Sequence, residues 1–213
     1  MGNSEEKNLP GAGHSDSGRL DAQLRFLLEI DREKEIIRNT YLADGSRLET
    51  DAEHAWHLAL FAMLLSGYAS EPVDRDHVIR MVLIHDLVEV YAGDTYAYDE
   101  AGKAGQQDRE REAAEKLFSM LPPDQYDEFM GLWEEFESLA TPESRFAKSL
   151  DRFQPALLND ASGGISWQEH GVRVSQVLKL NEHSAEGSAV LYERLLGLLE
   201  KNVRDGTLAD DRG

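Results

Sequence analysis

A histidine and an aspartate, His85 and Asp86, stand side by side at the end of an apolar run over residues 78–84. The run predicts a buried segment, so any fold of this chain must remove an imidazole and a carboxylate from water together. That step is costly unless a partner compensates for the lost hydration. A bound metal cation and a salt bridge are the two candidate partners, and the rest of the sequence bears on the choice between them.

Apolar residues recur at helical spacing along most of the chain, and no stretch shows the alternation of a half-buried strand. We therefore predict an all-α fold, a bundle of about seven or eight helices around one core. The segment 50–68 is apolar on nearly every side, which predicts the central helix. The expected helices cover residues 20–38, 50–68, 74–92, 108–121, 126–136, 141–157, 168–180 and 184–199.

Capping signals mark several of these boundaries. Thr50 and Glu53 have the spacing of a capping box, and Asp74 can cap the next helix. Gly93 is a natural stop for that helix, which we expect to run unbroken to about residue 92. Pro142 suits the first position of a later helix, where its missing N–H costs nothing.

The length of 213 residues is enough for one domain with a sizeable core, which we expect over residues 19–202. Residues 1–18 are rich in glycine, serine and charge, and we expect a disordered tail there. We expect a flexible tail over residues 203–213.

The composition excludes several classes of site and partner. The chain has no cysteine, which excludes disulfides, thiolate metal sites and a cysteine nucleophile. Its formal net charge of −19, from 22 basic and 41 acidic residues, disfavours binding to polymeric nucleic acid. A small phosphate ligand remains compatible, since a divalent cation and one or two arginines can invert the potential inside a pocket. The sequence shows neither a membrane-spanning run nor the apolar core of a signal peptide, so we expect a cytoplasmic protein.

Four other side chains are candidates for the same site as His85 and Asp86. Glu89 lies one helical turn further on, and Asp94 lies just past the expected helix end. His54 falls in the first turn of the central helix, and Asp151 interrupts an apolar helical stripe. Two histidines and two aspartates make a mixed nitrogen and oxygen ligand set that suits Mn, Co, Ni, Fe or Zn.

Each of these residues also has a simpler explanation. His54 can be an ordinary boundary histidine, and Asp151 can form a salt bridge with Lys148 or Arg152. Pro155 predicts a bend of the helix near Asp151, which alone does not make a site. Periodicity does not show whether the four possible ligands converge.

Four short motifs contain these residues: Glu53-His54-Ala55-Trp56-His57, His85-Asp86-Leu87-Val88-Glu89, Gly93-Asp94-Thr95 and Lys148-Ser149-Leu150-Asp151-Arg152. Together they resemble the motifs of HD-domain metal-dependent phosphohydrolases. Within that family they look most like the 5′-deoxynucleotidases, small all-α proteins that are commonly homodimeric. The similarity extends over about residues 20–199.

The resemblance implies a role for each motif residue. Glu89 matches the catalytic acid, and Asp94 matches a second acid that positions water or the sugar hydroxyl. Arg38 matches an arginine that holds the substrate phosphate, although Arg47 in the same stretch is an alternative. The implied metal ligands are His54, His85, Asp86 and Asp151.

Other residues refine this hypothesis. No histidine lies between Asp86 and Asp151, which favours one divalent ion over two. His57 is expected to pack in the core or to support the ligands from behind. Tyr96 and Tyr98 either pack or line the pocket. Base and sugar selectivity is expected to lie near Asn39 and the loop 96–105.

The expected function is that of a 5′-nucleotidase that removes phosphate from (deoxy)nucleoside 5′-monophosphates, with a nucleotide as its small-molecule partner and a homodimer as its assembly. One alternative is an HD hydrolase of another phosphate ester, such as a nucleoside triphosphate or an alarmone. The other is a non-catalytic metal-binding scaffold.

Overall fold

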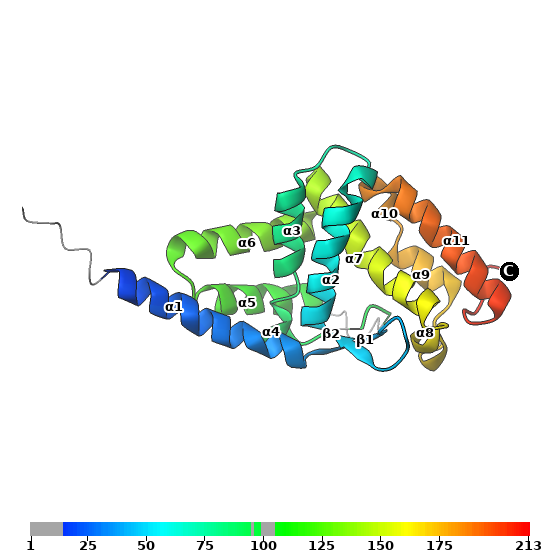
Figure 1. Ribbon diagram of the computed structural model, residues 1–213, viewed down its shortest axis with the longest axis horizontal. Coiled ribbons are helices and arrows are strands. Elements are labelled where there is room, and N and C mark those ends of the chain that lie inside the picture. The colour runs from blue at the N-terminus through cyan, green and yellow to red at the C-terminus, as the bar shows by residue number, and fades with distance from the viewer. Residues whose placement is uncertain (1–14, 95, 99–104) are drawn as a thin grey trace, which may run out of the picture.

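The all-α prediction is confirmed (Figure 1). The computed structural model describes residues 15–94, 96–98 and 105–213; the tail expected over 1–18 therefore lies largely outside the described residues. Seven helical segments are ten residues or longer, and none in the described part is long and apolar enough to cross a membrane. In chain order the elements are α1 (Ser15–Glu29), the 3₁₀ helix η1 (Ile30–Glu35), β1 (Ile37–Tyr41), β2 (Leu48–Thr50), α2 (Asp51–Leu65), the 3₁₀ helix η2 (Ser66–Tyr68), α3 (Arg75–Ile84), α4 (Glu89–Ala92), α5 (Gln106–Phe118), α6 (Pro123–Ser138), α7 (Pro142–Ala161), α8 (Ile165–Glu169), α9 (Val174–Leu180), α10 (Ser184–Gly187) and α11 (Ala189–Asp205).

A short hairpin contradicts the expectation that the chain holds no strand. β1 and β2 pair antiparallel, with Ile37 opposite Thr50 and Tyr41 opposite Leu48. The first predicted helix therefore ends early, because its last residues enter β1. Strands of five and three residues are too short to show a clear alternation in the sequence. The hairpin leads directly into α2 and carries Arg38 toward the centre of the molecule.

The predicted caps of α2 and α3 are confirmed. The Thr50 hydroxyl accepts a hydrogen bond from the Glu53 N–H, and the Glu53 carboxylate accepts one from the Thr50 N–H. Asp74 accepts hydrogen bonds from two backbone N–H groups in the first turn of α3. The capping box fixes where α2 begins and so holds His54 in its first turn.

The helix expected to run unbroken to residue 92 is interrupted, so that prediction is wrong. α3 ends at Ile84, residues 85–88 form a tight turn, and α4 is a single turn that stops at Gly93, where φ is +77°. In the turn the Glu89 N–H donates to the Asp86 carbonyl at 2.9 Å, the spacing of a 3₁₀ helix. The break changes how the side chains of residues 85–89 are presented to the core.

α7 is the longest helix, and it packs against α2, α3, α6, α10 and α11. It begins at a capping box formed by Thr141 and Ser144, with Pro142 at its first position as predicted. It remains helical through Pro155 and presents Asp151 on its buried side.

The C-terminal part is more broken and better anchored than expected. The predicted helix 168–180 is divided into α8 and α9 by a turn, and α8 begins at Ile165, before the predicted start at residue 168. Residues 203–213 do not form a free tail, because Leu208 is buried in the core and the Val174 N–H donates to the Ala209 carbonyl at 3.0 Å. The Ser175 hydroxyl also donates to Asp211 at 2.6 Å.

Candidate metal centre

Three side chains from separate elements meet at one point. His54 comes from the first turn of α2, His85 from the turn after α3, and Asp151 from the middle of α7. One ligand atom from each lies within 4.8 Å of the other two, and all three residues are buried. The structure therefore brings together residues that the sequence could only propose separately.

The fourth predicted ligand, Asp86, faces the same point. Its Oδ2 lies 3.1 Å from His85 Nε2 and 3.8 Å from His54 Nε2. Asp151 Oδ1 lies 3.1 Å from His54 Nε2 and 3.7 Å from His85 Nε2. Nε2 of each histidine thus faces two carboxylate oxygens. A positive charge located between these nitrogens and oxygens is stabilised by the two carboxylates.

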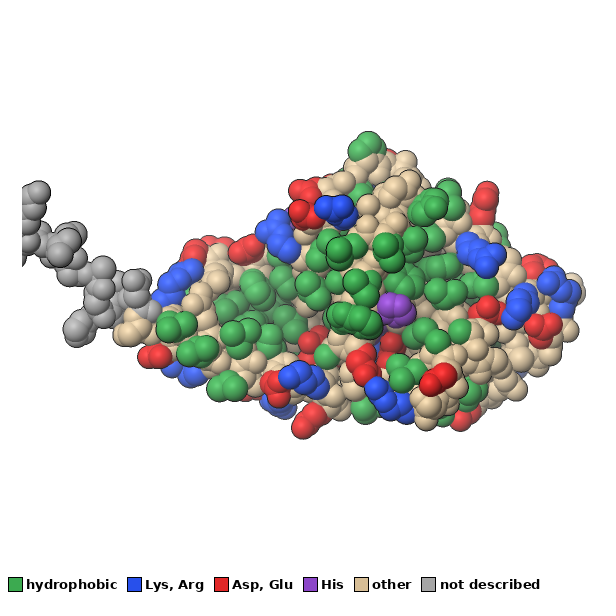
Figure 2. Space-filling model, viewed as in Figure 1, with side chains coloured by type: hydrophobic (Ala, Val, Ile, Leu, Met, Phe, Trp, Pro, Cys, Tyr) green, Lys and Arg blue, Asp and Glu red, His purple; other side chains and the backbone are tan. Residues whose placement is uncertain are grey.

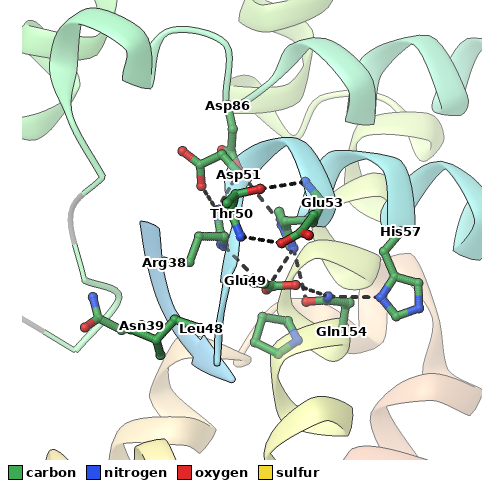
Figure 3. A network of polar contacts seen from close by, with 12 residues as sticks. Arg38, Asn39, Leu48, Glu49, Thr50, Asp51, Glu53, His57, Asp86 and Gln154 are labelled. Atoms are coloured by element: carbon green, nitrogen blue, oxygen red, sulfur yellow. Dashed lines mark hydrogen bonds and ion pairs between the residues drawn. The ribbon is translucent and has the colours of Figure 1, made fainter. Parts of the chain in front are cut away.

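Hydrogen bonds behind His54 determine which of its ring nitrogens is free. Gln154 Nε2 donates to Glu49 Oε2 at 3.0 Å and to His57 Nδ1 at 3.2 Å (Figure 3). Because its amide nitrogen is committed to two acceptors, Gln154 offers its oxygen to His54 Nδ1 at 3.1 Å. His54 Nδ1 therefore carries the proton, and Nε2 is left bare toward Asp151.

His85 is held in the same tautomer by a different partner. Its Nδ1 donates to the Val82 carbonyl at 2.9 Å, and its buried Nε2 has no hydrogen-bond partner among the described residues. Burial lowers the pKa of His85, but the charges of Asp86 and Asp151 outweigh it and raise that pKa to about 10. The negative field that attracts a proton to Nε2 also attracts a cation.

The donor set fits a divalent transition metal. His54 is neutral, because burial and the charge of Arg38 lower its pKa to about 4. Imidazoles whose Nδ1 is held by a hydrogen bond, combined with buried carboxylates, are the ligands that such ions take in proteins, and a metal would replace the proton that the carboxylates favour on His85. The residues present therefore fit the metal that the sequence predicts.

Arg38 reaches the centre from β1. Its Nη1 donates to Asp86 Oδ2 at 2.8 Å and to Asp51 Oδ1 at 2.9 Å. Arg47, the alternative, instead pairs with Glu53 and is more than half exposed. Of the two arginines, only Arg38 lines the cavity beside the candidate ligands.

Glu89 and Asp94 line the same cavity. Burial raises the pKa of Glu89 strongly, and the neighbouring charges of Asp86 and Asp51 raise it further, which favours the protonated form of this carboxyl. Burial likewise raises the pKa of Asp94 to about 6, against the opposing charge of Arg38. The two acids that the sequence proposes for the site therefore lie in one cavity with the candidate ligands.

The cavity has a volume of about 430 Å³, within the usual range of roughly 300–1,000 Å³ for small-molecule sites. Tyr96 and Tyr98 line it and also contact each other, with ring centroids 5.4 Å apart. Asn39 lines it too, whereas residues 99–104 of the expected selectivity loop lie outside the described residues. Large aromatic side chains complete the wall: Trp133, Phe136 and Trp167.

The supporting residues Glu49, Asp51 and Gln154 were not predicted from the sequence, yet each is almost fully buried. Gln154 lies one helical turn after Asp151 on the buried side of α7, and a polar residue at such a position is the signal that could have identified it. His57, expected to pack in the core, contacts Phe61 edge-on at 4.7 Å and also accepts the hydrogen bond from Gln154.

Comparison with known proteins identifies the family. The family model described as HD domain matches residues 30–191. A solved structure described as a predicted metal-dependent phosphohydrolase from Magnetospirillum magnetotacticum MS-1 is 47% identical, with a TM-score of 0.87 over 92% of this chain and 98% of that chain.

Curated relatives point the same way. The 5′-deoxynucleotidase HDDC2 of Mus musculus is 30% identical over 142 residues, 66% of this chain and 70% of the relative. The Homo sapiens protein of the same name is 30% identical over 135 residues, 63% of this chain and 65% of the relative. The chain thus spans about two thirds of the length of these relatives. With most of its length matched by the family model, the chain belongs to the HD-domain family.

Proposed function

We propose that the protein is a metal-dependent 5′-deoxynucleotidase, a phosphomonoesterase that releases phosphate from deoxynucleoside 5′-monophosphates. The observation that carries the proposal is the convergence of His54, His85 and Asp151 beside a cavity that Glu89 also lines. The names of the curated relatives support the substrate class.

In this proposal His54, His85, Asp86 and Asp151 hold one divalent ion, of the group Mn, Co, Ni, Fe or Zn. When bound, such an ion polarises a phosphoryl oxygen and lowers the pKa of a water toward neutrality.

The acids and the arginine have separate tasks. Glu89 holds a proton at its buried carboxyl and passes it to the leaving 5′-oxygen. Asp94 orients the attacking water or the sugar hydroxyl from the cavity wall. Arg38, held beside Asp86, contributes positive charge toward the phosphate oxygens.

Phosphate release from a panel of nucleotides, with added Mn²⁺ or Co²⁺, tests this function. The panel includes deoxynucleoside and nucleoside monophosphates, triphosphates and an alarmone. We expect deoxynucleoside monophosphates to be the preferred substrates and Glu89→Ala to remove at least about 99% of the activity, the scale of general acid catalysis. Glu112→Ala, an exposed acid on α5, is the control. Equal activity of the wild type and Glu89→Ala rules out the catalytic role of Glu89.

We further propose that the protein is a homodimer. Apolar side chains gather on one face over α1, α2 and α3 (Figure 2), and four exposed leucines of α1 have helical spacing. Sedimentation velocity is expected to show a dimer that Leu24→Asp with Leu28→Asp converts to a monomer; a monomeric wild type refutes the proposal. The exposed large apolar residues of these helices are Leu20, Leu24, Leu27, Leu28, Trp56, Met63, Leu64 and Leu83.

We also propose the cytoplasm as its compartment, which fractionation of cells expressing the tagged chain tests.

A further inference from the structure

Two cationic side chains of α7 lie one helical turn apart on the wall of the cavity. Lys148 and Arg152 both line it, on either side of the candidate ligand Asp151 in the sequence. About a quarter of each side chain is exposed, 24% for Lys148 and 27% for Arg152. They therefore remain accessible from the cavity while α7 fixes their position.

Neither cation is tightly paired with another described residue. Lys148 Nζ lies 3.5 Å from Glu137 Oε1, and Arg152 Nε lies 3.9 Å from Asp151 Oδ2. Arg38, in contrast, has Nη1 within 2.9 Å of two carboxylates. The α7 cations thus keep most of their N–H donors for a ligand, whereas one donor group of Arg38 is committed to the protein.

The charge of the cavity wall makes these donors necessary for an anionic ligand. Six acidic residues line the described part of the cavity, and Arg38, Lys148 and Arg152 are the lysines and arginines among the same lining residues. A phosphomonoester bears up to two negative charges, so the ionised acids repel it unless cations meet its oxygens. The acidic residues of the wall are Asp86, Glu89, Asp94, Glu110, Glu137 and Asp151.

We infer that Lys148 and Arg152 form an anion-binding edge that receives the non-bridging oxygens of the substrate phosphate from α7, while Arg38 approaches from β1. The planar guanidinium of Arg152 suits two oxygens at once. The Lys148 ammonium, which lies 4.1 Å from the centroid of the Phe136 ring, supplies a single mobile charge. The assignment of the anion as a phosphomonoester rests on the proposed function; the anion site itself does not.

Binding of inorganic phosphate to the Mn²⁺-saturated protein, followed by calorimetry, tests the inference without any turnover. Lys148→Met and Arg152→Met are each expected to weaken phosphate binding about tenfold, the value of one charge-assisted hydrogen bond. Lys148→Arg retains the charge and is expected to retain binding within about threefold. Arg80→Met removes one charge from the exposed surface of α3 and is expected to bind phosphate as the wild type does.

A structural role for the two cations predicts a different result. If Lys148 and Arg152 only screen Asp151, their methionine variants lose affinity for Mn²⁺ but bind phosphate normally once Mn²⁺ is saturating, and that outcome overturns the inference. Phosphate binding that depends on both residues in a protein without nucleotidase activity refutes the proposed function but not this site. Normal nucleotide turnover with unchanged KM in both methionine variants refutes the site but not the function.

Discussion

The side-chain oxygen of Gln154 lies 3.1 Å from Nδ1 of His54, and both residues are fully buried. This contact joins α7 to α2 directly behind the candidate metal centre. Because Gln154 is itself held by Glu49 and His57, it fixes both the orientation and the tautomer of His54.

Gln154→Met keeps the volume of the side chain but removes the hydrogen bond to His54. We expect the affinity for Mn²⁺ to fall about 10- to 100-fold, the usual effect of losing a group that orients a ligand. The wild type and the variant are compared by titration with the metal, with Gln125→Met on α6 as a control. Unchanged metal affinity in Gln154→Met shows that the contact does not tune the centre.

Gly187 lies where α10 packs against α7. A Cβ at this position would lie 2.1 Å from the Arg145 carbonyl oxygen, a backbone atom that cannot move aside. We expect Gly187→Ala to lower the free energy of unfolding by about 3 kcal/mol, the cost of overpacking.

Gly197 is the matched control for Gly187. It lies inside α11 with open space around its Cβ position, so Gly197→Ala is expected to stabilise the protein by about 0.5–1 kcal/mol. Thermal or urea unfolding measures both changes. Equal stability of the two variants contradicts the close approach of α10 and α7.

Glu33 is buried on η1, and its Oε1 has no hydrogen-bond partner in the described part of the chain. Burial raises its pKa to about 7, and the charges of Asp86 and Asp51 add to this, partly offset by His85 and Arg38. The folded state therefore binds a proton that the unfolded state releases near pH 4.5. The stability that the protonated Glu33 carboxyl contributes is fully present below pH 4.5 and is lost as the pH rises through about 7.

We expect Glu33→Gln to be more stable than the wild type at pH 8, with the difference shrinking toward pH 5. Thermal unfolding of protein treated with a chelator measures this, since a bound cation would itself favour the ionised carboxylate. Glu35→Gln, an exposed change on the same helix, is the control. A stability gain that is the same at both pH values contradicts the assignment.

The starts of α2, α3 and α7 and the candidate ligands could be predicted because their signals are local. The capping box at Thr50 and the proline at the start of α7 are short patterns, and each matches the structure. His85 and Asp86 are adjacent in an apolar run, so burial alone singles them out.

The remainder depends on contacts between distant parts of the chain. Gln154 lies 100 residues from His54 and 105 from Glu49, and no spacing rule links such partners. The break after α3 was missed because the sequence 74–92 satisfies a helical pattern, whereas the tertiary structure presents Asp86 beside His85 Nε2. The hairpin was missed because its strands are short and because β1 packs against α7 and α8, which lie far along the chain.

The number of metal ions bound per chain tests the central claim most directly. Equilibrium titration with Mn²⁺ is expected to give one ion per wild-type chain and none, at the same concentrations, for His85→Ala. His183→Ala, an exposed histidine paired with Glu186, is expected to keep that ion. If His85→Ala binds the ion as tightly as the wild type, the centre formed by His54, His85, Asp86 and Asp151 is not the metal site.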